Sequence, residues 1–552
     1  MNKTRALIVH LSSFIVLLPL LAFGEQKPPV PPIGETIEVS LVNLDVFVTD
    51  KTGQRVHGLT KDDFEILENG VRQPVTNFAE YTHESTLTLQ TPATPVAAPA
   101  PRQKRTIVVF VERISLPPFR TDPFFASMKK LLHDAIRPGD RAMIVTWDRG
   151  VLVTQQSFTE SLPALDRAVD TVAKLSSQPM QDTRADMRFM IEFARSFDDA
   201  AAAAGMSTDA DGLAMMETDF FAQIEKTSQI QMVRTLNALI RSIAADEGKK
   251  ILLLVTHRLS REAGAETYWQ TIPSMERHLP LEKKAAMDMS TYLKSIDDTA
   301  NANGVTMYPM FPEGLETTVT DASEADTVRN VDFRRLNNEM HALREIAEET
   351  GGLTAAGTDV TRLLPRVAED LDSYYSLAYR VRNTGADKAR KIVVRTKDRS
   401  LTVRSRREFM EKSDTTRMED RVIAALFSNP PSPGFALNVV VGVPRPRGKE
   451  FTLPLTINVP IGVLTQLRDG RQYAGAFSVY FAWGGRLGGL SDTSHETKNY
   501  AIPAEEIDKA RASGHLTYQI QLAIDRKTER IAFGVVDEIS KDFALRLMPL
   551  RR

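Results

Sequence analysis

The strongest constraint on the fold is a short apolar run followed by a capped amphipathic helix. Residues 107–111 (IVVFV) are rich in β-branched side chains and show no polar alternation, as is typical of a strand buried on both faces of a parallel sheet. Residues 122–123 (Asp-Pro) supply a helix N-cap and a first helical proline, and residues 138–139 (Pro-Gly) end the helical spacing. Because residues 141–147 (RAMIVTW) are apolar again, the segment predicts a β-α-β unit.

The same alternation resumes later in the chain. Residues 250–256 and 304–310 are further apolar runs, helical spacing lies between and after them, and residues 373–381 form a last strand-like run. Residues 151–158 follow the preceding run too closely for a crossover helix, so we expect an antiparallel edge strand there. The sequence predicts an α/β domain with a doubly wound, mostly parallel sheet of about six strands and a ligand crevice beyond the carboxyl ends of the strands.

Three parts of the chain resemble a known family. They are residues 42–50 leading into 58–70, the central β-α-β unit, and residues 346–352 together with 369–377. They resemble the von Willebrand factor type A domain, and more narrowly the VWFA-related proteins that are abundant in acidobacterial genomes. The resemblance covers residues from about 36 to 409, and it implies a binding module rather than a catalyst.

The resemblance also implies where a metal would bind. A type A domain that holds Mg²⁺ uses Asp-x-Ser-x-Ser after the first strand, a later Thr, and an Asp after the fourth strand, because a hard cation needs oxygen ligands. The first three positions correspond here to Glu112, Ile114 and Leu116, and the late Asp has no counterpart. We therefore expect no Mg²⁺ and no other cofactor. Glu112, Ser115 and Asp148 are the residues that would hold a metal if one bound.

The crevice contains basic residues instead. Arg113 follows the first strand and Arg258 follows the fourth, and both would repel a cation. We expect them to accept an acidic side chain of a partner directly, through the paired contacts that a guanidinium makes with a carboxylate. The candidate binding residues at the strand carboxyl ends are Glu112, Arg113, Ser115, Asp148, Thr256 and Arg258.

Composition excludes several classes of function. The chain has 69 basic and 71 acidic residues, for a net charge of −2, so no charge excess favours nucleic acid or an anionic membrane. It contains no cysteine, which removes disulfides, thiolate metal sites, cysteine nucleophiles and a lipoprotein anchor. His-Glu-x-x-His, a phosphate loop and a Gly-x-Ser-x-Gly elbow are all missing from the sequence. A non-enzyme is therefore predicted, and an exported, peptidase-like hydrolase with an unrecognised site is the alternative.

The first residues predict export. Lys3 and Arg5 precede an apolar stretch at 6–21, and residues 22–24 include the small side chains that signal peptidase requires. We expect cleavage after Gly24 and a secreted, periplasmic or cell-envelope protein. An uncleaved membrane anchor is the competing interpretation, although the apolar stretch is short for a span. No later run in the sequence approaches transmembrane length.

Shifts in periodicity and composition predict the domain boundaries. Asn69 and Gly70 lie between two apolar runs and predict a two-residue hairpin. Regular alternation after residue 434 predicts an antiparallel sandwich. The predicted segments are a signal peptide (1–24), an N-terminal β module (25–83), a Thr/Pro/Ala-rich linker (84–105), a type A-like domain with a helical insertion at 178–227 and a terminal β-hairpin (106–409), a helix and linker (410–433), and a C-terminal β-sandwich (434–552).

Together these features predict an exported, non-catalytic binding protein. Its type A-like domain would contact another protein, or a polymer of the cell envelope or extracellular space, and the flanking β modules would position it. Neither nucleic acid nor a membrane-spanning segment beyond the signal peptide is expected.

Overall fold

The computed structural model divides the chain into two compact units. One consists of residues 38–240 and 246–412, and the other of residues 413–552 with 1–37 and 241–245. The residues that the structure describes are 15–16, 38–82, 104–113, 118–148, 150–177, 210–244, 246, 248–271, 280–312, 325–356, 364–427, 434–448, 450–485, 491 and 493–550. None of the helices in these ranges combines the length and apolar character needed to cross a membrane. The predicted signal peptide and linker fall almost entirely outside these ranges.

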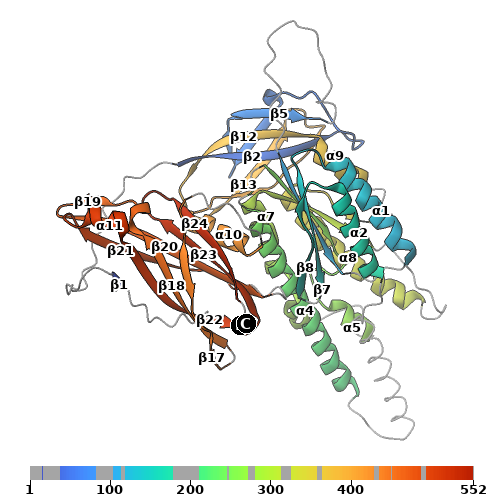
Figure 1. Cartoon of the computed structure of the whole chain (residues 1–552). Coiled ribbons are helices and arrows are strands. Elements are labelled where there is room, and N and C mark those ends of the chain that lie inside the picture. Colours follow the sequence, from blue (N-terminus) through green and yellow to red (C-terminus); the bar gives the residue numbers. More distant parts are fainter. Residues whose placement is uncertain are drawn as a thin grey trace. The chain divides into compact units, whose positions relative to one another are not determined.

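The first unit is built on a six-stranded sheet (Figure 1). Its order is β11-β10-β9-β6-β7-β8, and every pair of neighbours is parallel except β7 with β8. The predicted antiparallel edge strand after residue 148 is therefore confirmed. The strands are β6 (Arg105–Glu112), β7 (Arg141–Asp148), β8 (Val151–Thr159), β9 (Lys249–Val255), β10 (Val305–Phe311) and β11 (Ala355–Ala356).

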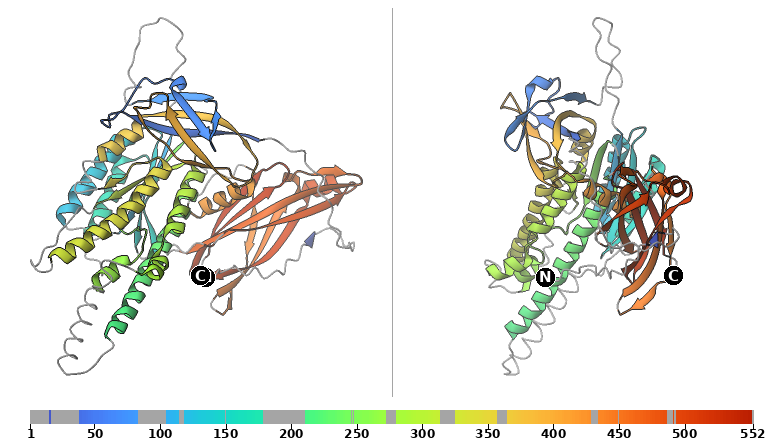
Figure 2. Two further views of the ribbon diagram at one scale, coloured as in Figure 1. Left: turned by 180° about the vertical axis from the view of Figure 1, so that it is seen from behind. Right: turned by 90° about the vertical axis from the view of Figure 1, so that its left-hand side faces the viewer.

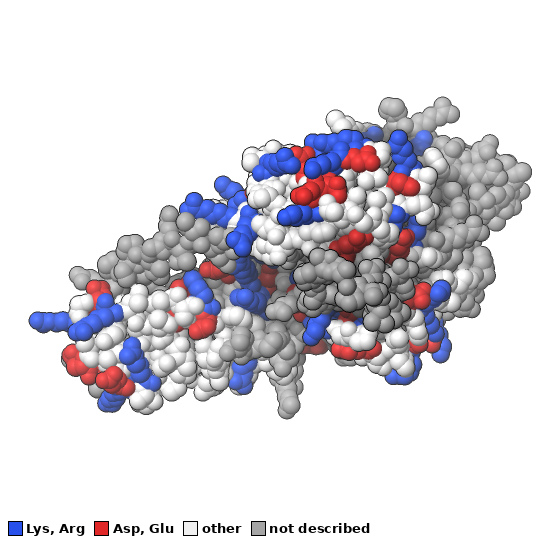
Figure 3. Space-filling view, turned by 90° about the horizontal axis from the view of Figure 1, so that it is seen from above, with Lys and Arg blue, Asp and Glu red and all other residues white. Residues whose placement is uncertain are grey.

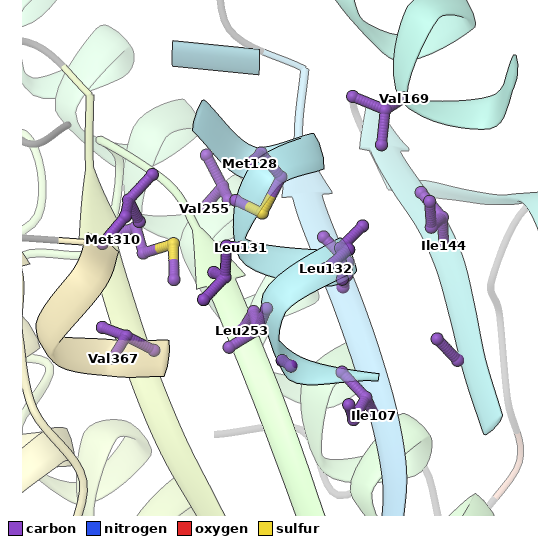
Figure 4. Packing of buried hydrophobic residues seen from close by; sticks show 14 of the residues in the cluster. Ile107, Met128, Leu131, Leu132, Ile144, Val169, Leu253, Val255, Met310 and Val367 are labelled. Atoms are coloured by element: carbon purple, nitrogen blue, oxygen red, sulfur yellow. The ribbon is translucent and has the colours of Figure 1, made fainter. Parts of the chain in front are cut away.

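Three helices pack on one face of this sheet. They are α1 (Pro118–Ala135), α2 (Leu162–Ser177) and α9 (Leu364–Asp372). Alternate residues of the central strands point into the core under them, so that Ile107 and Leu253 meet Leu131 and Met128 of α1 (Figure 4). These four side chains are almost completely buried. Each such burial contributes roughly 1.5–3 kcal/mol, so this face is a main source of the stability of the unit.

Other helices cover the opposite face. Helices α7 (Ser290–Asn303) and α8 (Ala325–Thr350) contact β10 and each other, and Figure 2 shows them in green and yellow beside the sheet. Helix α4 (Ala210–Ser242) buries Leu236 and Leu239. Two short helices, α5 (Ala265–Thr271) and α6 (Leu281–Met287), share a small apolar cluster with α4. The predicted helical insertion at 178–227 is thus partly accounted for by α4, and residues 178–209 lie outside the described ranges.

The β module lies at the amino edge of the six-stranded sheet, at the top of Figure 1. It has two four-stranded sheets, in the orders β14-β2-β12-β5 and β15-β13-β3-β4, around one apolar core. A short 3-10 turn, η1 (Lys61–Asp63), precedes β3. The strands are β2 (Glu38–Thr49), β3 (Phe64–Glu68), β4 (Val71–Gln73), β5 (Asn77–Tyr81), β12 (Tyr374–Asn383), β13 (Ala389–Thr396), β14 (Thr402–Arg404) and β15 (Glu408–Met410).

Two sequence predictions were wrong about this module. Residues 373–381 do not close the α/β sheet, because β12 pairs with β2 and β5 instead. The predicted terminal hairpin at 380–407 is absent from the described strands, since β13 pairs with β3 and β15 while β14 pairs with β2. The module is therefore assembled from both ends of the unit, and its core needs Tyr379 and Val394 as much as Leu44 and Ile66.

The predicted hairpin at residues 69–70 is confirmed. Strands β3 and β4 pair antiparallel, with Glu68 opposite Val71. Asn69 and Gly70 have φ values of 48° and 82°, the left-handed geometry that a two-residue turn of this kind requires.

The surface seen from above in Figure 3 carries charges of both signs. Over the described residues, Lys and Arg lie among Asp and Glu, and neither sign forms a continuous field.

The second unit contains two antiparallel five-stranded sheets that share one apolar core. The first sheet is β1-β22-β18-β16 with β17 on β18, and the second is β19-β20-β23-β24 with β21 on β20. Phe477 and Phe481 of β20 and Ile457 of β18 point into that core, as the alternation after residue 434 predicts. The elements are β1 (Ile15–Val16), α10 (Asp414–Phe427), β16 (Asn438–Val441), β17 (Arg445–Arg447), β18 (Glu450–Pro460), η4 (Ile461–Val463), β19 (Leu467–Asp469), β20 (Gln472–Gly485), β21 (Ser494–Pro503), α11 (Ile507–Ser513), β22 (His515–Asp525), β23 (Thr528–Asp537) and β24 (Phe543–Pro549).

Candidate binding site at the carboxyl edge of the sheet

The carboxyl ends of β6 and β9 bring the predicted site residues together. The two strands are parallel neighbours, and Val111 of β6 lies opposite Val255 of β9. Glu112, the last residue of β6, and Thr256, the first residue after β9, therefore lie at the same edge of the sheet. The amide of Thr256 donates to the carbonyl of Met310 on β10 (3.1 Å), which fixes the start of the loop after β9.

Glu112 is held by groups of that loop. The hydroxyl of Thr256 donates to Oε2 of Glu112 (2.5 Å), and the amide of His257 donates to the same oxygen (3.3 Å). Nε of Arg258 lies 2.7 Å from the other oxygen, Oε1. Glu112 is 2% exposed and Arg258 is 7% exposed. Both carboxylate oxygens of Glu112 are thus occupied inside the protein.

Arg258 also reaches a carboxylate on the far side. Its Nη1 donates to Oε2 of Glu225 on α4 (3.1 Å), and Nε2 of Gln229, one turn further along, donates to Oε1 of Glu225 (3.1 Å). Ser260 hydrogen-bonds Gln229 in turn. The guanidinium therefore lies between two buried carboxylates, and the second oxygen of each accepts a further hydrogen bond. Such additional hydrogen bonds are the condition under which a buried ion pair can be tolerated.

Glu225 and Gln229 were not among the site residues predicted from the sequence. A signal for them exists, because both lie on the buried face of α4 that also carries Met232 and Leu236. Charged residues are rarely buried unless they are paired. A Glu and a Gln four residues apart on an apolar helix face therefore indicate a buried polar network, although the sequence does not reveal its partner.

Arg113 and Asp148 form a second pair at the same edge. Nη1 of Arg113 donates to Oδ2 of Asp148 (2.9 Å), and Nε of Arg113 lies 3.4 Å from the carbonyl of Leu175. The Arg113 amide donates to the carbonyl of Trp147, so the pairing of β6 with β7 sets the geometry. The side chains are 21% and 26% exposed. Of the predicted site residues that the structure describes, these two are the most accessible.

The residues at this edge do not fit a divalent metal. Both carboxylate oxygens of Glu112 already contact protein groups, and the guanidinium of Arg258 supplies the positive charge beside it. Mg²⁺ requires near-octahedral oxygen ligands at about 2.0–2.1 Å, and it would have to displace Arg258 to reach Glu112. In the described part of the chain, no three His, Asp or Glu side chains cluster as metal ligands do.

The structure places the described members of the predicted site in two groups. Glu112, Thr256 and Arg258 form one buried cluster, and Arg113 with Asp148 forms a partly exposed pair. Ser115 lies outside the described residues, as do Ile114 and Leu116. Arg258 does not present its guanidinium to solvent as the sequence analysis expected, because Glu112 and Glu225 lie on either side of it.

Comparisons with known proteins give no family assignment. No family model matches the chain, and no curated protein matches it. Among solved structures, the vWF domain of the type V pili tip protein Mfa5 from Porphyromonas gingivalis is 10% identical, with a TM-score of 0.23, and 49% of this chain and 95% of that chain are covered.

Two further solved structures are similar at the same level. A mutant of the PilB minor pilin from Streptococcus sanguinis is 8% identical, with a TM-score of 0.24 and coverage of 59% of this chain and 93% of that chain. Proximal thread matrix protein 1 from the mussel byssus is 10% identical with a TM-score of 0.21, over 49% of this chain and 48% of that chain, so this chain spans about half of its length. With TM-scores this low, these likenesses do not establish a shared fold or function.

Proposed function

We propose that the chain is an exported, non-catalytic binding protein of the von Willebrand factor A-like type. Its α/β domain contacts a protein, or a polymer of the cell envelope or extracellular space, without a bound metal. Support for export comes from the basic, apolar and small-residue pattern of residues 1–24. Support for the domain type comes from the sequence resemblance and from the order and parallel pairing of the six strands.

The observation that carries the metal-free part of the proposal is the placement of Arg258. In a metal-dependent type A site the cation would lie beside the residue that corresponds to Glu112. Here Nε of Arg258 lies 2.7 Å from Oε1 of Glu112. The guanidinium of Arg258, which Glu225 holds in place, takes the position of an exchangeable metal ion. Partner binding therefore needs no metal to complete the site.

Arg113 and Asp148 are the residues that a partner would touch. Their side chains are about one quarter exposed and lie at the carboxyl edge of the sheet, where ligands of open α/β sheets bind. Arg113 can exchange Asp148 for an acidic group of the partner, because a guanidinium makes paired contacts to carboxylates. We expect the partner surface to be acidic at this point.

A capture experiment tests the proposal. The chain from residue 25 onward is immobilised and exposed to envelope and secreted fractions of the source organism, in the presence of either Mg²⁺ or a chelator. The expected result is a partner that stays bound in chelator, is lost with Arg113→Gln, and is kept with Lys130→Gln. Lys130 is a matched control because it is an exposed basic residue paired with Asp134 on α1.

Two outcomes would overturn the proposal. Binding that disappears in chelator would mean that a metal completes the site after all. Turnover of a member of a broad peptide and glycoside panel by the purified chain would support the alternative, an exported hydrolase with a site that carries no recognised motif.

A further inference from the structure

A cavity of about 520 Å³ lies at the amino edge of the six-stranded sheet, at the opposite end of the strands from Arg258. Strand β2 of the β module forms one wall through Asn43, Asp45 and Phe47, and the starts of β9 and β10 form another. Helices α7 and α8 also end beside the cavity, and the residues that follow them, Gly304 and Gly351, line it. Cavities of about 300–1,000 Å³ are the size in which proteins hold small molecules.

Positive side chains dominate the described lining of this cavity. Four basic residues face one acidic residue there: Lys104, Lys249, Lys250 and Arg406 against Asp45. Nζ of Lys249 lies 3.2 Å from Oδ2 of Asp45, and Lys249 also lies over the ring of Tyr374 at 3.6 Å. Asp45 therefore pairs with Lys249 and also attracts Arg406. One carboxylate cannot neutralise four cations, so the described lining keeps a surplus of positive charge.

Neutral groups hold two of these cations in place. Lys250 donates to the backbone carbonyl of Asp246 (2.9 Å), and Arg406 donates to the carbonyls of Asn43 (2.7 Å) and Asn301 (3.3 Å). Nε of Arg406 is buried and has no acceptor in the described part of the chain. Carbonyl dipoles orient these side chains but leave their charge largely uncompensated.

Two of the lining lysines have lowered pKa values, chiefly because they are buried. Burial lowers the pKa of Lys249 to about 8, an effect that Asp45 opposes and that Arg105 and Arg404 reinforce. Burial likewise lowers the pKa of Lys250 to about 8, where Asp246 opposes the effect and Lys412 and Arg406 reinforce it. An anion in the cavity would stabilise the charged forms of both lysines.

We propose that this cavity binds a small molecule through a doubly charged anionic group, such as a phosphate monoester. Four cations and one carboxylate line the described wall, and this surplus calls for more than one negative charge on the ligand. Three of the cations are ammonium groups, which suit phosphate because they act as compact point charges. The site shares no residue with the proposed partner surface at Arg113 and Asp148, so it is independent of the proposed function.

The test compares three sugars of the same ring by calorimetric titration: glucose 6-phosphate, glucuronate and glucose. We expect glucose 6-phosphate to bind, glucuronate to bind at least tenfold more weakly because it carries one charge, and glucose not to bind. Equal affinity for glucose and its phosphate, or no binding of the phosphate, would overturn the proposal.

Substitutions locate the site. Lys250→Gln and Lys104→Gln should each weaken glucose 6-phosphate binding by about tenfold, the usual cost of losing one charge-assisted contact. Lys51→Gln, an exposed lysine in a turn of the same module, is the matched control. Lys104 is itself exposed, so its variant keeps the test decisive if Lys250→Gln does not fold. Arg113→Gln should leave this affinity unchanged. Affinities unaltered in both lysine variants would place the anion elsewhere and contradict the proposal.

The pH dependence provides a second readout. A phosphate monoester keeps two charges above pH 7.5, since its second pKa is about 6. Its affinity should therefore fall as pH rises from 7.5 to 9.5, because Lys249 and Lys250 lose their protons near pH 8. The fall should be smaller in Lys250→Gln. Affinity that is constant over this range would contradict binding by these lysines.

Discussion

The two ends of the six-stranded sheet differ in how far their buried charges are paired with charges of the opposite sign. At the carboxyl edge, Arg258 lies between Glu112 and Glu225, and Arg113 pairs with Asp148. At the amino edge, four basic residues and one acidic residue line the described wall of a cavity. The first edge is balanced by the protein's own side chains, whereas the second has a surplus of one sign.

This contrast separates the two ends chemically. A balanced buried network is closed to small ions, because any ion would have to displace a partner that is already well placed. A surplus of cations that are partly shielded from water attracts an anion, because binding relieves their mutual repulsion. The same sheet therefore has a charge-balanced network at one edge and a cavity with surplus positive charge at the other.

The largest expected effect follows from removing the cation of the balanced edge. Arg258→Met should lower the free energy of unfolding by about 3–5 kcal/mol, because it leaves Glu112 and Glu225 buried without their shared partner. Urea unfolding measures the change. The double variant Arg258→Met with Glu112→Gln should be less destabilised than the sum of its single variants, since it removes one of the stranded charges. A midpoint equal to that of the Lys130→Gln control would contradict the network.

A smaller, pH-dependent effect is expected at the surplus edge. The pKa of Lys250 is lowered from 10.5 to about 8 in the folded chain, so between these values the unfolded chain binds more protons than the folded one. Stability should therefore rise as pH increases through this window. Between pH 8 and 9.5 the increase in the free energy of unfolding should be smaller in Lys250→Met than in the unaltered chain, by roughly 1–2 kcal/mol. This range allows for partial screening of Lys250 by solvent.

The measurement is urea unfolding at three pH values, with Lys51→Met as the control. The range stops at pH 9.5 because tyrosines of the unfolded chain begin to ionise near pH 10. A slope that is the same in Lys250→Met and in the unaltered chain would show that Lys250 does not carry the uncompensated charge.

The partly exposed pair at the carboxyl edge should contribute less than the buried network. Asp148→Asn should lower the free energy of unfolding by about 0.5–1 kcal/mol, because solvent screens a pair whose side chains are 21% and 26% exposed. The effect should shrink further in high salt. A loss as large as that of Arg258→Met would mean that the two pairs are equally buried in solution.

Much of the sheet could be predicted from the sequence, because its strands are continuous apolar runs such as residues 107–111 and helical spacing separates them. The β module was harder. Its strand β12 has the same apolar character as a core strand, and only its pairing with β2 shows where it belongs. Strands that are distant in sequence carry no local signal of their partner.

The site was predictable in part for a similar reason. Glu112 and Thr256 lie at the carboxyl ends of neighbouring parallel strands, so the sheet topology alone brings them together. Glu225 comes from α4, inside a predicted insertion, and nothing in its local sequence points to Arg258. The cavity at the amino edge was missed altogether, because Lys250 and Arg406 are separated by more than 150 residues and meet only when β2 lies across the strand ends.

The smallest expected effect is the absence of a response to metal. Millimolar Mg²⁺ should not change the unfolding midpoint of the chain, because both oxygens of Glu112 are occupied by Thr256, His257 and Arg258. A micromolar site would be easy to see, since ligand at about 1,000 times its dissociation constant stabilises a protein by roughly 4 kcal/mol. Thermal or urea unfolding with Mg²⁺, Mn²⁺ and Ca²⁺ makes the measurement.

Glu112→Gln serves as the control, because it separates this edge from weak binding elsewhere on the surface. A stabilisation that is present in the unaltered chain and lost in Glu112→Gln would mean that Arg258 moves aside for a cation, and the balanced edge would then resemble the metal-dependent type A site that its sequence departs from.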